Sequence, residues 1–367
     1  MSFCGSYRQD DVTFLLKRLP PLPPFDVAQK EKLIQSGLRH YSEMLTPETL
    51  PSQRYLEVFQ SAFETNKPQM ARDCLTLAAL VSARRSGPIT LVSLVRAGTP
   101  VGVILTHLLR QVLGREVVHY SISIVRDRGI DEVALGHILK EGHAPESIIF
   151  IDGWTGKGVI SRALTQAIEN FNRRNFCAID SGLYVLSDLA GSATAAASSV
   201  DYLIPSSILN ATVSGLVSRS VLNESIGPND FHGCVYYSEF ETRDLSREFA
   251  DSLVAEGISQ AKEQRATAGW HRPVPMDKSR AAAISNDFLR ATMTQHSIND
   301  ANLIKPGIGE ATRVLLRRVP RLLILREPEA PDVQHLKVLA IEKAVPLVVD
   351  ACLPYQAVSL IQSALDG

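Results

Sequence analysis

The chain has 367 residues, of which 45% are hydrophobic and 6% aromatic, and its formal net charge is -1. This composition indicates a globular protein of two or three domains and excludes a globally basic nucleic-acid-binding protein. No apolar run reaches the 18 residues of a membrane-spanning helix, and the first residues lack the apolar core of a signal peptide, so we expect a cytoplasmic protein without a membrane partner.

The first 70 residues are expected to form an N-terminal helical cap, with a proline-rich connector at 19–24. From residue 71 to 260, short β-branched segments alternate with amphipathic helices. The predicted strands are 89–95, 117–125, 148–151, 183–187 and 202–204, and the predicted helices are 70–84, 101–113, 131–141 and 158–172. This alternation requires crossover connections, so it predicts an α/β fold with a mainly parallel, doubly wound sheet.

The rest of the chain is expected to form a separate unit. A linker with helical character covers 261–295, and the glycine and paired prolines of 269–275 mark the boundary. A small α/β domain then covers 296–367. Its predicted helices are 309–318, 332–343 and 355–364, and its predicted strands are 321–325 and 345–349. The small-residue segment 191–199 is predicted as a helix or a loop.

The strand 148–151 runs into an acid and then a turn rich in glycine and threonine. Asp152 lies where this strand leaves the sheet, which is where open α/β sheets bind ligands. Three glycines of the turn permit positive φ angles and a close backbone approach, and the N–H groups from Thr155 onward open the next helix. These glycines are Gly153, Gly156 and Gly158. The spacing around Lys157 excludes a Walker A motif and the dinucleotide fingerprint, so it predicts another kind of phosphate-binding loop.

A second loop follows the strand 89–95 and carries Arg96, then Ala97, Gly98 and Thr99. Two such loops at one sheet edge can flank one ligand, and the planar arginine fork suits a diphosphate. The alternative is an ordinary surface turn.

Two further arginines, Arg126 and Arg128, follow the strand 117–125 and open onto the same edge. They can close over a diphosphate. The alternative there is a solvated turn in which Asp131 caps the next helix.

These loops resemble those of the type I phosphoribosyltransferases. The segments 5–7, 91–100, 119–131, 152–158 and 230–233 resemble more closely the phosphoribosyltransferase-like proteins encoded with bacterial tellurite-resistance and stress genes, a family that also carries the label StiP cysteine protease. The resemblance covers most of residues 1–250. It implies a sheet of the type I phosphoribosyltransferase kind, and an enzyme that uses Mg2+ and phosphoribosyl diphosphate to move ribosyl phosphate to or from a base-like acceptor.

By the same resemblance, Asp152 would hold the ribose hydroxyls and Mg2+, and Arg96 and Arg126 would complete the catalytic set. The phosphate-binding residues would be Ala97, Gly98, Thr99, Gly153, Thr155, Gly156, Lys157, Gly158 and Arg128. The usual motif has a second acid where this chain has Gly153. Its threonine comes five residues after the first acid, whereas Thr155 comes three residues after Asp152. The sequence therefore supports binding of the ligand better than it supports catalytic turnover. A noncatalytic nucleotide sensor that acts through RNA is a further alternative.

The protease label gives a second hypothesis about the thiols. The five cysteines are scattered and form no CxxC pair, which fits reduced thiols. Asp230, His232 and Cys234 alternate along a predicted strand and share a face, and a thiolate near an imidazole is a nucleophile. Side chains two residues apart on a strand rarely bond to each other, so Cys4 with His40 or His119 is a second choice. The alternative for each cysteine is a small core residue.

The segments 302–312, 321–331 and 345–349 resemble the Pelota-type RNA-binding domain and its kink-turn-binding ribosomal relatives, over roughly residues 300–364. The resemblance places RNA at a glycine-rich turn and the start of the next helix. The predicted RNA contacts are Lys305, Gly307, Gly309, Glu310, Thr312 and Arg313. The alternative is a charged helix face that only packs domains together. The expected partners are therefore phosphoribosyl diphosphate or a nucleotide, and a structured RNA; the oligomeric state is left open.

Overall fold

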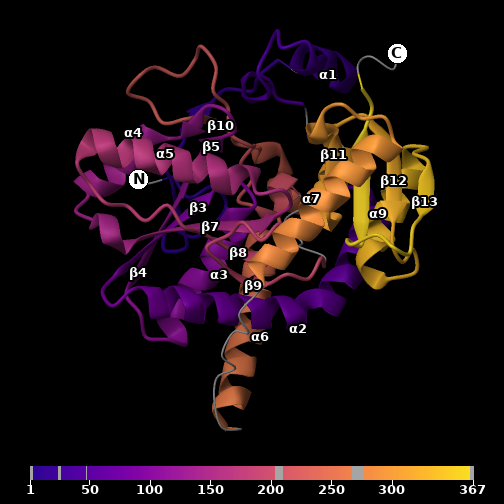
Figure 1. Cartoon of the computed structure of the whole chain (residues 1–367). Coiled ribbons are helices and arrows are strands. Elements are labelled where there is room, and N and C mark those ends of the chain that lie inside the picture. Colours follow the sequence, from indigo (N-terminus) through magenta and orange to yellow (C-terminus); the bar gives the residue numbers. More distant parts are fainter. Residues whose placement is uncertain (1–2, 24–25, 47, 203–209, 267–276, 364–367) are drawn as a thin grey trace.

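The computed structural model describes residues 3–23, 26–46, 48–202, 210–266 and 277–363. At its centre lies a six-stranded sheet in the order β1-β4-β3-β7-β8-β9, in which all neighbouring strands are parallel (Figure 1). The strands are β1 (Thr13–Phe14), β3 (Ile89–Leu94), β4 (Val117–Ile122), β7 (Ile148–Thr155), β8 (Leu183–Asp188) and β9 (Ala195–Ser198). The predicted α/β architecture with a mainly parallel sheet is confirmed.

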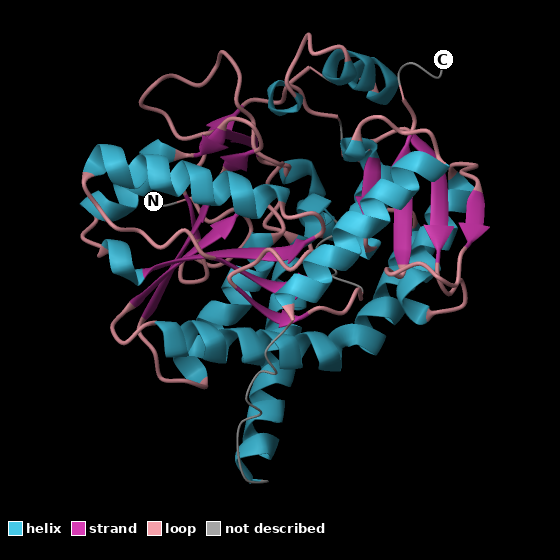
Figure 2. Ribbon diagram, viewed as in Figure 1, coloured by secondary structure: helices cyan, strands magenta, loops and turns pink. Residues whose placement is uncertain are grey.

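Helices cover both faces of this sheet (Figure 2). They are α2 (Gln53–Arg84), α3 (Gly98–Gln111), α4 (Glu132–Lys140), α5 (Val159–Asn175) and α6 (Ser246–Ala266). Successive residues of a strand point to opposite faces, so Leu91 and Ile149 join the core under α2, α3 and α6, whereas Val92 and Phe150 join the core under α4 and α5. Two buried cores therefore fix the orientation of the strand ends that carry the predicted loops.

The first 70 residues are less helical than predicted. β1 extends the edge of the main sheet, and β2 (Lys17–Leu19) pairs in parallel with β10 (Gly233–Val235). The helices of this region are α1 (Val27–Gln35), the 3-10 turn η1 (Tyr41–Glu43) and the first half of α2. Strands of two and three residues are too short to carry a period-two pattern, so their hydrogen bonds to distant strands decide their conformation.

The end of the chain forms a small separate α/β domain, as predicted. Its four-stranded sheet has the order β11-β14-β12-β13. The strands are β11 (Ile304–Pro306), β12 (Pro320–Leu325), β13 (Leu347–Val349) and β14 (Ala357–Ile361), and the helices are α7 (Lys278–Gln295), α8 (Ile308–Arg317) and α9 (Gln334–Glu342). The predicted helix 355–364 is wrong, because β14 lies between two partner strands and all five of its residues are buried.

Several short elements complete the fold. They are β5 (Ile124–Val125), β6 (Gly129–Ile130), and the 3-10 turns η2 (Pro145–Ser147), η4 (Asn210–Val213), η5 (Ser238–Arg243), η6 (Ala301–Leu303) and η7 (Pro331–Val333). β9 occupies part of the small-residue segment that was predicted as a helix or loop. The predicted strand 202–204 lies mostly outside the described residues, as does the predicted boundary 269–275. Within the described ranges, no helix combines the length and apolar character that crossing a membrane requires.

Candidate functional site

The loops that follow β3 and β7 lie against each other, because these two strands are parallel neighbours. A Cβ atom on Gly98 would lie 2.4 Å from the carbonyl oxygen of Ile151, so this close approach requires glycine. Arg96 and Asp152 thereby reach the same edge of the sheet, where both line one pocket. The structure thus brings together the two strand ends that the sequence singled out.

The turn after β7 is shorter than predicted. β7 continues through Thr155, so residues 152–155 belong to the strand, and of the three glycines only Gly158 has a positive φ, at 68°. The Thr155 hydroxyl donates to the Asp188 carboxylate. The Lys157 ammonium donates to two backbone carbonyl oxygens of the C-terminal domain, at 2.7 and 3.0 Å. Two groups predicted to bind phosphate therefore already have protein partners.

Helix α8 of the C-terminal domain packs onto this sheet edge. A Cβ atom on Gly309 would lie 2.7 Å from the indole ring of Trp154, and the guanidinium of Arg313 lies 4.3 Å from the centre of that ring. A Cβ atom on Gly156 would lie 3.3 Å from the Glu310 side chain. Three of the predicted RNA contacts on α8, Gly309, Glu310 and Arg313, thus lie against residues of the predicted phosphate loop.

The carboxylate of Asp201 holds the two domains in this arrangement. It accepts hydrogen bonds from the backbone N–H of Ile308, at the start of α8, and of Gln356, each at 2.9 Å. Burial raises the pKa of Asp201 to about 6. A carboxylate at a helix start also interacts favourably with the positive end of the helix dipole.

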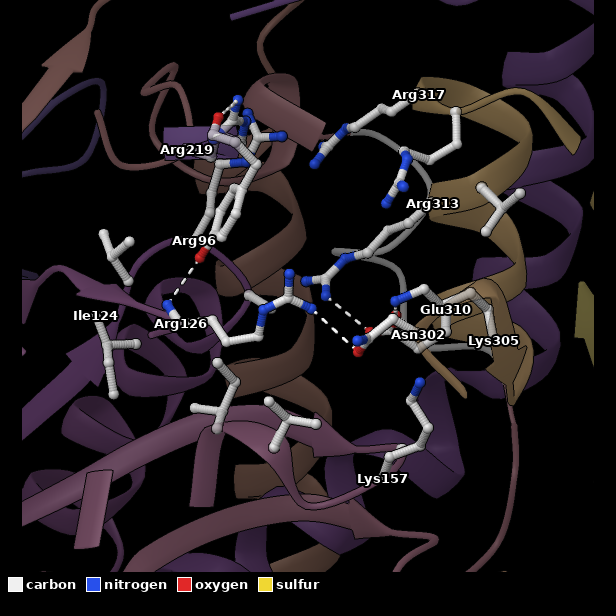
Figure 3. A pocket seen from close by; sticks show the side chains of 18 of the residues that line it. Arg96, Ile124, Arg126, Lys157, Arg219, Asn302, Lys305, Glu310, Arg313 and Arg317 are labelled. Atoms are coloured by element: carbon white, nitrogen blue, oxygen red, sulfur yellow. Dashed lines mark hydrogen bonds and ion pairs between the residues drawn. The ribbon is translucent and has the colours of Figure 1, made fainter. Parts of the chain in front are cut away.

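A pocket of about 520 Å3 opens between the sheet edge and α8. Cationic side chains from both sides line it, as Figure 3 shows for Arg313 and Arg317 opposite Arg126 and Lys157. The lining cations are Lys30, Arg96, Arg126, Lys157, Arg219, Lys305, Arg313, Arg317 and Arg318, and the lining carboxylates are Asp152, Asp300 and Glu310. We call this the cationic pocket. Its charge contrasts with the net charge of -1 for the whole chain.

Some of these cations have carboxylate partners. Arg96 lies 2.6 Å from Glu48, whose side chain also lies 3.9 Å from Arg317. Arg318 donates two hydrogen bonds to Glu31, at 2.5 and 2.6 Å. On α8 itself, an ion pair joins Glu310 to Arg313 at 3.0 Å. Arg128 does not line the pocket and pairs with Glu43 at 2.5 Å.

Three other cations of the pocket bond only to neutral oxygen atoms within the described residues. Lys30 donates to the Thr46 hydroxyl, Lys157 to backbone carbonyls, and Arg219 to two further carbonyls. Burial and neighbouring cations lower the pKa of Lys30 and of Lys157 to about 7 each. Burial also lowers the pKa of Arg219 to about 10. The pocket is therefore electrostatically strained by its own positive charge.

We expect Lys30→Met to stabilise the protein at neutral pH. The folded-state pKa of about 7 lies below the unfolded value of 10.5, so this group costs stability at pH 7 and the cost disappears as the pH rises toward 10. Removing the charge should raise the free energy of unfolding at pH 7 by roughly 1–3 kcal/mol, and less at pH 10. Thermal unfolding at the two pH values measures this. The control Lys32→Met changes an exposed lysine of the same helix. A lower melting temperature for Lys30→Met than for the parent chain at pH 7 would contradict the claim that the buried charge of Lys30 destabilises the protein.

The thiols lie away from the cationic pocket: none of the five cysteines lines it. Cys234 lies on β10 with its sulfur in the core, and burial raises its pKa to about 12. The His232 ring bonds to the Ser123 hydroxyl at 2.7 Å, and its backbone N–H donates to the Asp131 carboxylate at 2.6 Å. In the described part of the chain, no thiol is hydrogen-bonded to an imidazole. Residues His232 and Cys234 are therefore neighbours in the chain but not a preassembled pair.

The other thiol and imidazole candidates have separate surroundings. Cys4 is half-buried in the turn before β1. His40 caps η1 by accepting the N–H of Ser42. His119 lies in the core, where burial lowers its pKa to about 4, and it bonds to Ser93 and to a backbone carbonyl.

The predicted Mg2+ site has one carboxylate. Asp152 accepts the N–H of Gly153 at 2.7 Å, and burial raises its pKa to about 6. The described residues include no group of three or more potential metal ligands. Mg2+ normally keeps several waters and needs substrate oxygens besides one or two carboxylates, so Mg2+ at Asp152 stays a prediction that depends on a bound ligand.

Sequence reasoning missed several residues of the pocket. Lys30 comes from a segment with no glycine-rich turn or periodic charge that would mark it, and so does Glu48, which lies outside the pocket lining but pairs with the pocket residue Arg96. Three other residues of the pocket carried a signal. Arg219 ends the hydroxyl-rich segment 210–219, which fits either a phosphate contact or the polar face of a helix start, and Arg317 and Arg318 belong to the acid-free arginine run that begins at Arg313. Lys30 and Arg317 reach the strand ends only because α1 and α8 dock there, and no local sequence pattern reports such docking.

Comparison with known proteins gave two family matches and one close relative. A model described as "Tellurite-like stress resistance cysteine protease StiP" matches residues 5–254, and a model of the PELOTA RNA binding domain matches residues 283–363. A protein of Acinetobacter baylyi (strain ATCC 33305 / BD413 / ADP1) named "Cysteine protease StiP" is 41% identical over 377 residues, which cover 100% of this chain and 96% of that protein.

Proposed function

This chain belongs to the family of tellurite-like stress resistance cysteine proteases StiP, and from that membership we propose that it hydrolyses peptide bonds through a cysteine thiol. The observation that carries the proposal is the 41% identity, over the whole chain, to a protein named as a cysteine protease. The expected phosphoribosyltransferase activity is wrong, because the family and the relative are both named as cysteine proteases. The phosphoribosyltransferase kind of sheet stays a prediction.

We assign the nucleophile to Cys234 and the base to His232. Both lie inside the family match, as do Cys74 and Cys177, whereas Cys4 and Cys352 lie outside it. Cys234 is the one of these three that has a histidine in its own segment. In cysteine hydrolysis the base takes the thiol proton, the thiolate attacks the peptide carbonyl, the amine leaves with that proton, and water cleaves the acyl-thioester.

This assignment requires a movement. The side chain of Cys234 is fully buried, and β10 is flanked by β2 and by residues 217–221. A peptide reaches the sulfur only if these segments separate, and the separation also removes the burial that raises the thiol pKa. The proposal therefore includes a substrate-dependent opening beside β10.

Hydrolysis of denatured casein by the reduced full-length chain tests the function. Cleavage should need a reducing agent and stop after treatment with a peptidyl epoxide, which alkylates nucleophilic thiols. EDTA and the serine-directed inhibitor phenylmethylsulfonyl fluoride should leave it unchanged. Cleavage that resists the epoxide, or stops with EDTA, would reject a thiol mechanism.

RNA binding by the C-terminal domain is a second proposed function, and the match to the PELOTA RNA binding domain supports it. Three of the predicted contacts, Lys305, Glu310 and Arg313, line the cationic pocket, so an RNA that uses them must reach the pocket mouth. The other three predicted contacts, Gly307, Gly309 and Thr312, pack against the first domain or inside the C-terminal domain.

We expect Arg313→Gln to weaken binding of a structured RNA. Losing one phosphate contact should lower affinity about 10-fold at low salt and reduce the slope of log affinity against log salt by about 1. Filter binding across a salt series measures both. The control is Arg290→Gln on α7, an exposed arginine whose ion pair is with Asp287 of the same helix. Equal affinity and slope for the two variants would remove Arg313 from the RNA contact.

A further inference from the structure

We propose that the cationic pocket binds a phosphate-bearing anion of mononucleotide size that contacts both domains at once. The proposal does not depend on peptide hydrolysis, because no cysteine lines the pocket. Nine cationic side chains and three carboxylates line it, and like charges held together in a partly buried space repel one another strongly. A protein retains such a cluster at a cost in stability, and a bound anion removes the cost.

Unpaired donors inside the cluster point to the same conclusion. Arg96 Nη2, Arg219 Nη1 and Arg317 Nε are buried and have no hydrogen-bond partner among the described residues. A buried donor left without a partner destabilises the folded protein, and more so when it is charged. Arg96 itself is only 8% exposed, so these donors are not ordinary surface groups. Guanidinium donors match phosphate oxygens in geometry as well as in charge.

Size and wall chemistry favour a nucleotide over a bare phosphate ion. The volume of about 520 Å3 lies within the range of small-molecule sites, and one phosphate ion would fill only a small part of it. Apolar side chains, among them Ile124, Val125 and Ile160, also line the pocket. The Tyr41 ring, with the Arg126 and Arg219 guanidinium carbons each 5.4 Å from its centre, adds a flat surface. A ligand with an anionic end and a planar end fits a lining that combines cationic side chains with apolar and aromatic ones.

The two sides of the pocket come from different parts of the chain. Arg126 follows β5 beside the main sheet, whereas Arg313 projects from α8, and both point into the pocket (Figure 3). Arg126 also donates to Asn302 at 3.3 Å, so the two domains already touch across the mouth. An anion between them would add attraction across the domain contact and stabilise the whole chain in one transition.

Thermal unfolding of the full-length chain tests the proposal. The probes are ATP, GTP, CTP and UTP, each with and without MgCl2, together with inorganic phosphate, a polyglutamate peptide, an RNA oligonucleotide, and KCl at matched ionic strength. At least one nucleotide should raise the melting temperature by about 2 °C or more above the KCl value. Arg126→Gln and Arg313→Gln should each reduce that rise, because both side chains are partly exposed and neither is needed for the core. Arg290→Gln should keep it.

Three results would overturn the proposal. The first is no nucleotide effect beyond that of KCl. The second is an unchanged rise in both pocket variants. The third is a rise produced only by a polyglutamate peptide or only by an RNA oligonucleotide, which would make the pocket a contact surface for an acidic peptide or for an RNA strand. A rise that requires MgCl2 would support the predicted role of Mg2+ beside Asp152.

Discussion

Cys234→Ala is expected to abolish peptide hydrolysis. If Cys234 is the nucleophile, its removal eliminates the acyl-thioester route, and the turnover number should fall by about 1,000-fold or more. The measurement is casein cleavage by the reduced full-length variant. Alanine is slightly smaller than cysteine, so the buried site should tolerate the change and the melting temperature should fall only slightly.

The matched control is Cys177→Ala, because Cys177 also lies inside the family match and is half-buried. Its thiol donates to the Asn172 side chain at 3.2 Å, and no hydrogen bond joins it to an imidazole among the described residues. This variant should keep full activity. Full activity in Cys234→Ala, with loss in Cys177→Ala or Cys4→Ala, would move the nucleophile to another cysteine.

Glu48→Gln is expected to cause the largest loss of stability. Burial alone would raise the pKa of Glu48, but the nearby Arg96 and Arg317 outweigh it and lower the pKa below 4.5. The side chain is only 12% exposed, and it also accepts the N–H of Ala211. A neutral glutamine leaves the arginines without a counter-charge, so the free energy of unfolding should fall by about 3–5 kcal/mol. Chemical denaturation at pH 7 measures this.

The pH dependence gives an independent check on Glu48. A carboxylate with a lowered folded-state pKa stabilises the protein above its unfolded pKa, and that stabilisation is lost as the pH falls through the folded pKa. The difference between the parent chain and Glu48→Gln should therefore shrink below about pH 4. Glu57→Gln, which changes an exposed residue of α2, is the control and should be neutral at both pH values. A loss in Glu48→Gln that is no larger than in this control would contradict the role of Glu48.

The central fold was predictable because its signals are local. The strands β3, β4, β7 and β8 are apolar runs between amphipathic helices, and the crossovers make them parallel. β14 was taken for a helix because Ala357–Ile361 is a short apolar stretch that fits either conformation. Its two neighbouring strands decide the outcome, and both are distant in sequence.

The candidate site was predictable only in part. Arg96 and Asp152 meet because parallel strand ends share one edge, which follows from topology alone. The approach of α8 depends on tertiary contacts, namely Gly309 against Trp154 and the Asp201 carboxylate at the start of α8. No spacing in the sequence predicts such contacts. Lys305, Glu310 and Arg313 were predicted as an RNA surface, and in the structure they line the pocket.

Mapping a covalent label tests the central claim most directly. The reduced full-length chain is treated with one equivalent of a peptidyl epoxide, and with iodoacetamide in a parallel sample, and the modified cysteines are identified by mass spectrometry. Iodoacetamide should modify the exposed Cys352 first and leave the buried Cys234 largely unmodified. The peptidyl epoxide should modify Cys234 as casein cleavage stops. Loss of cleavage with the label on any other cysteine, or no loss when Cys234 is labelled, would contradict the account.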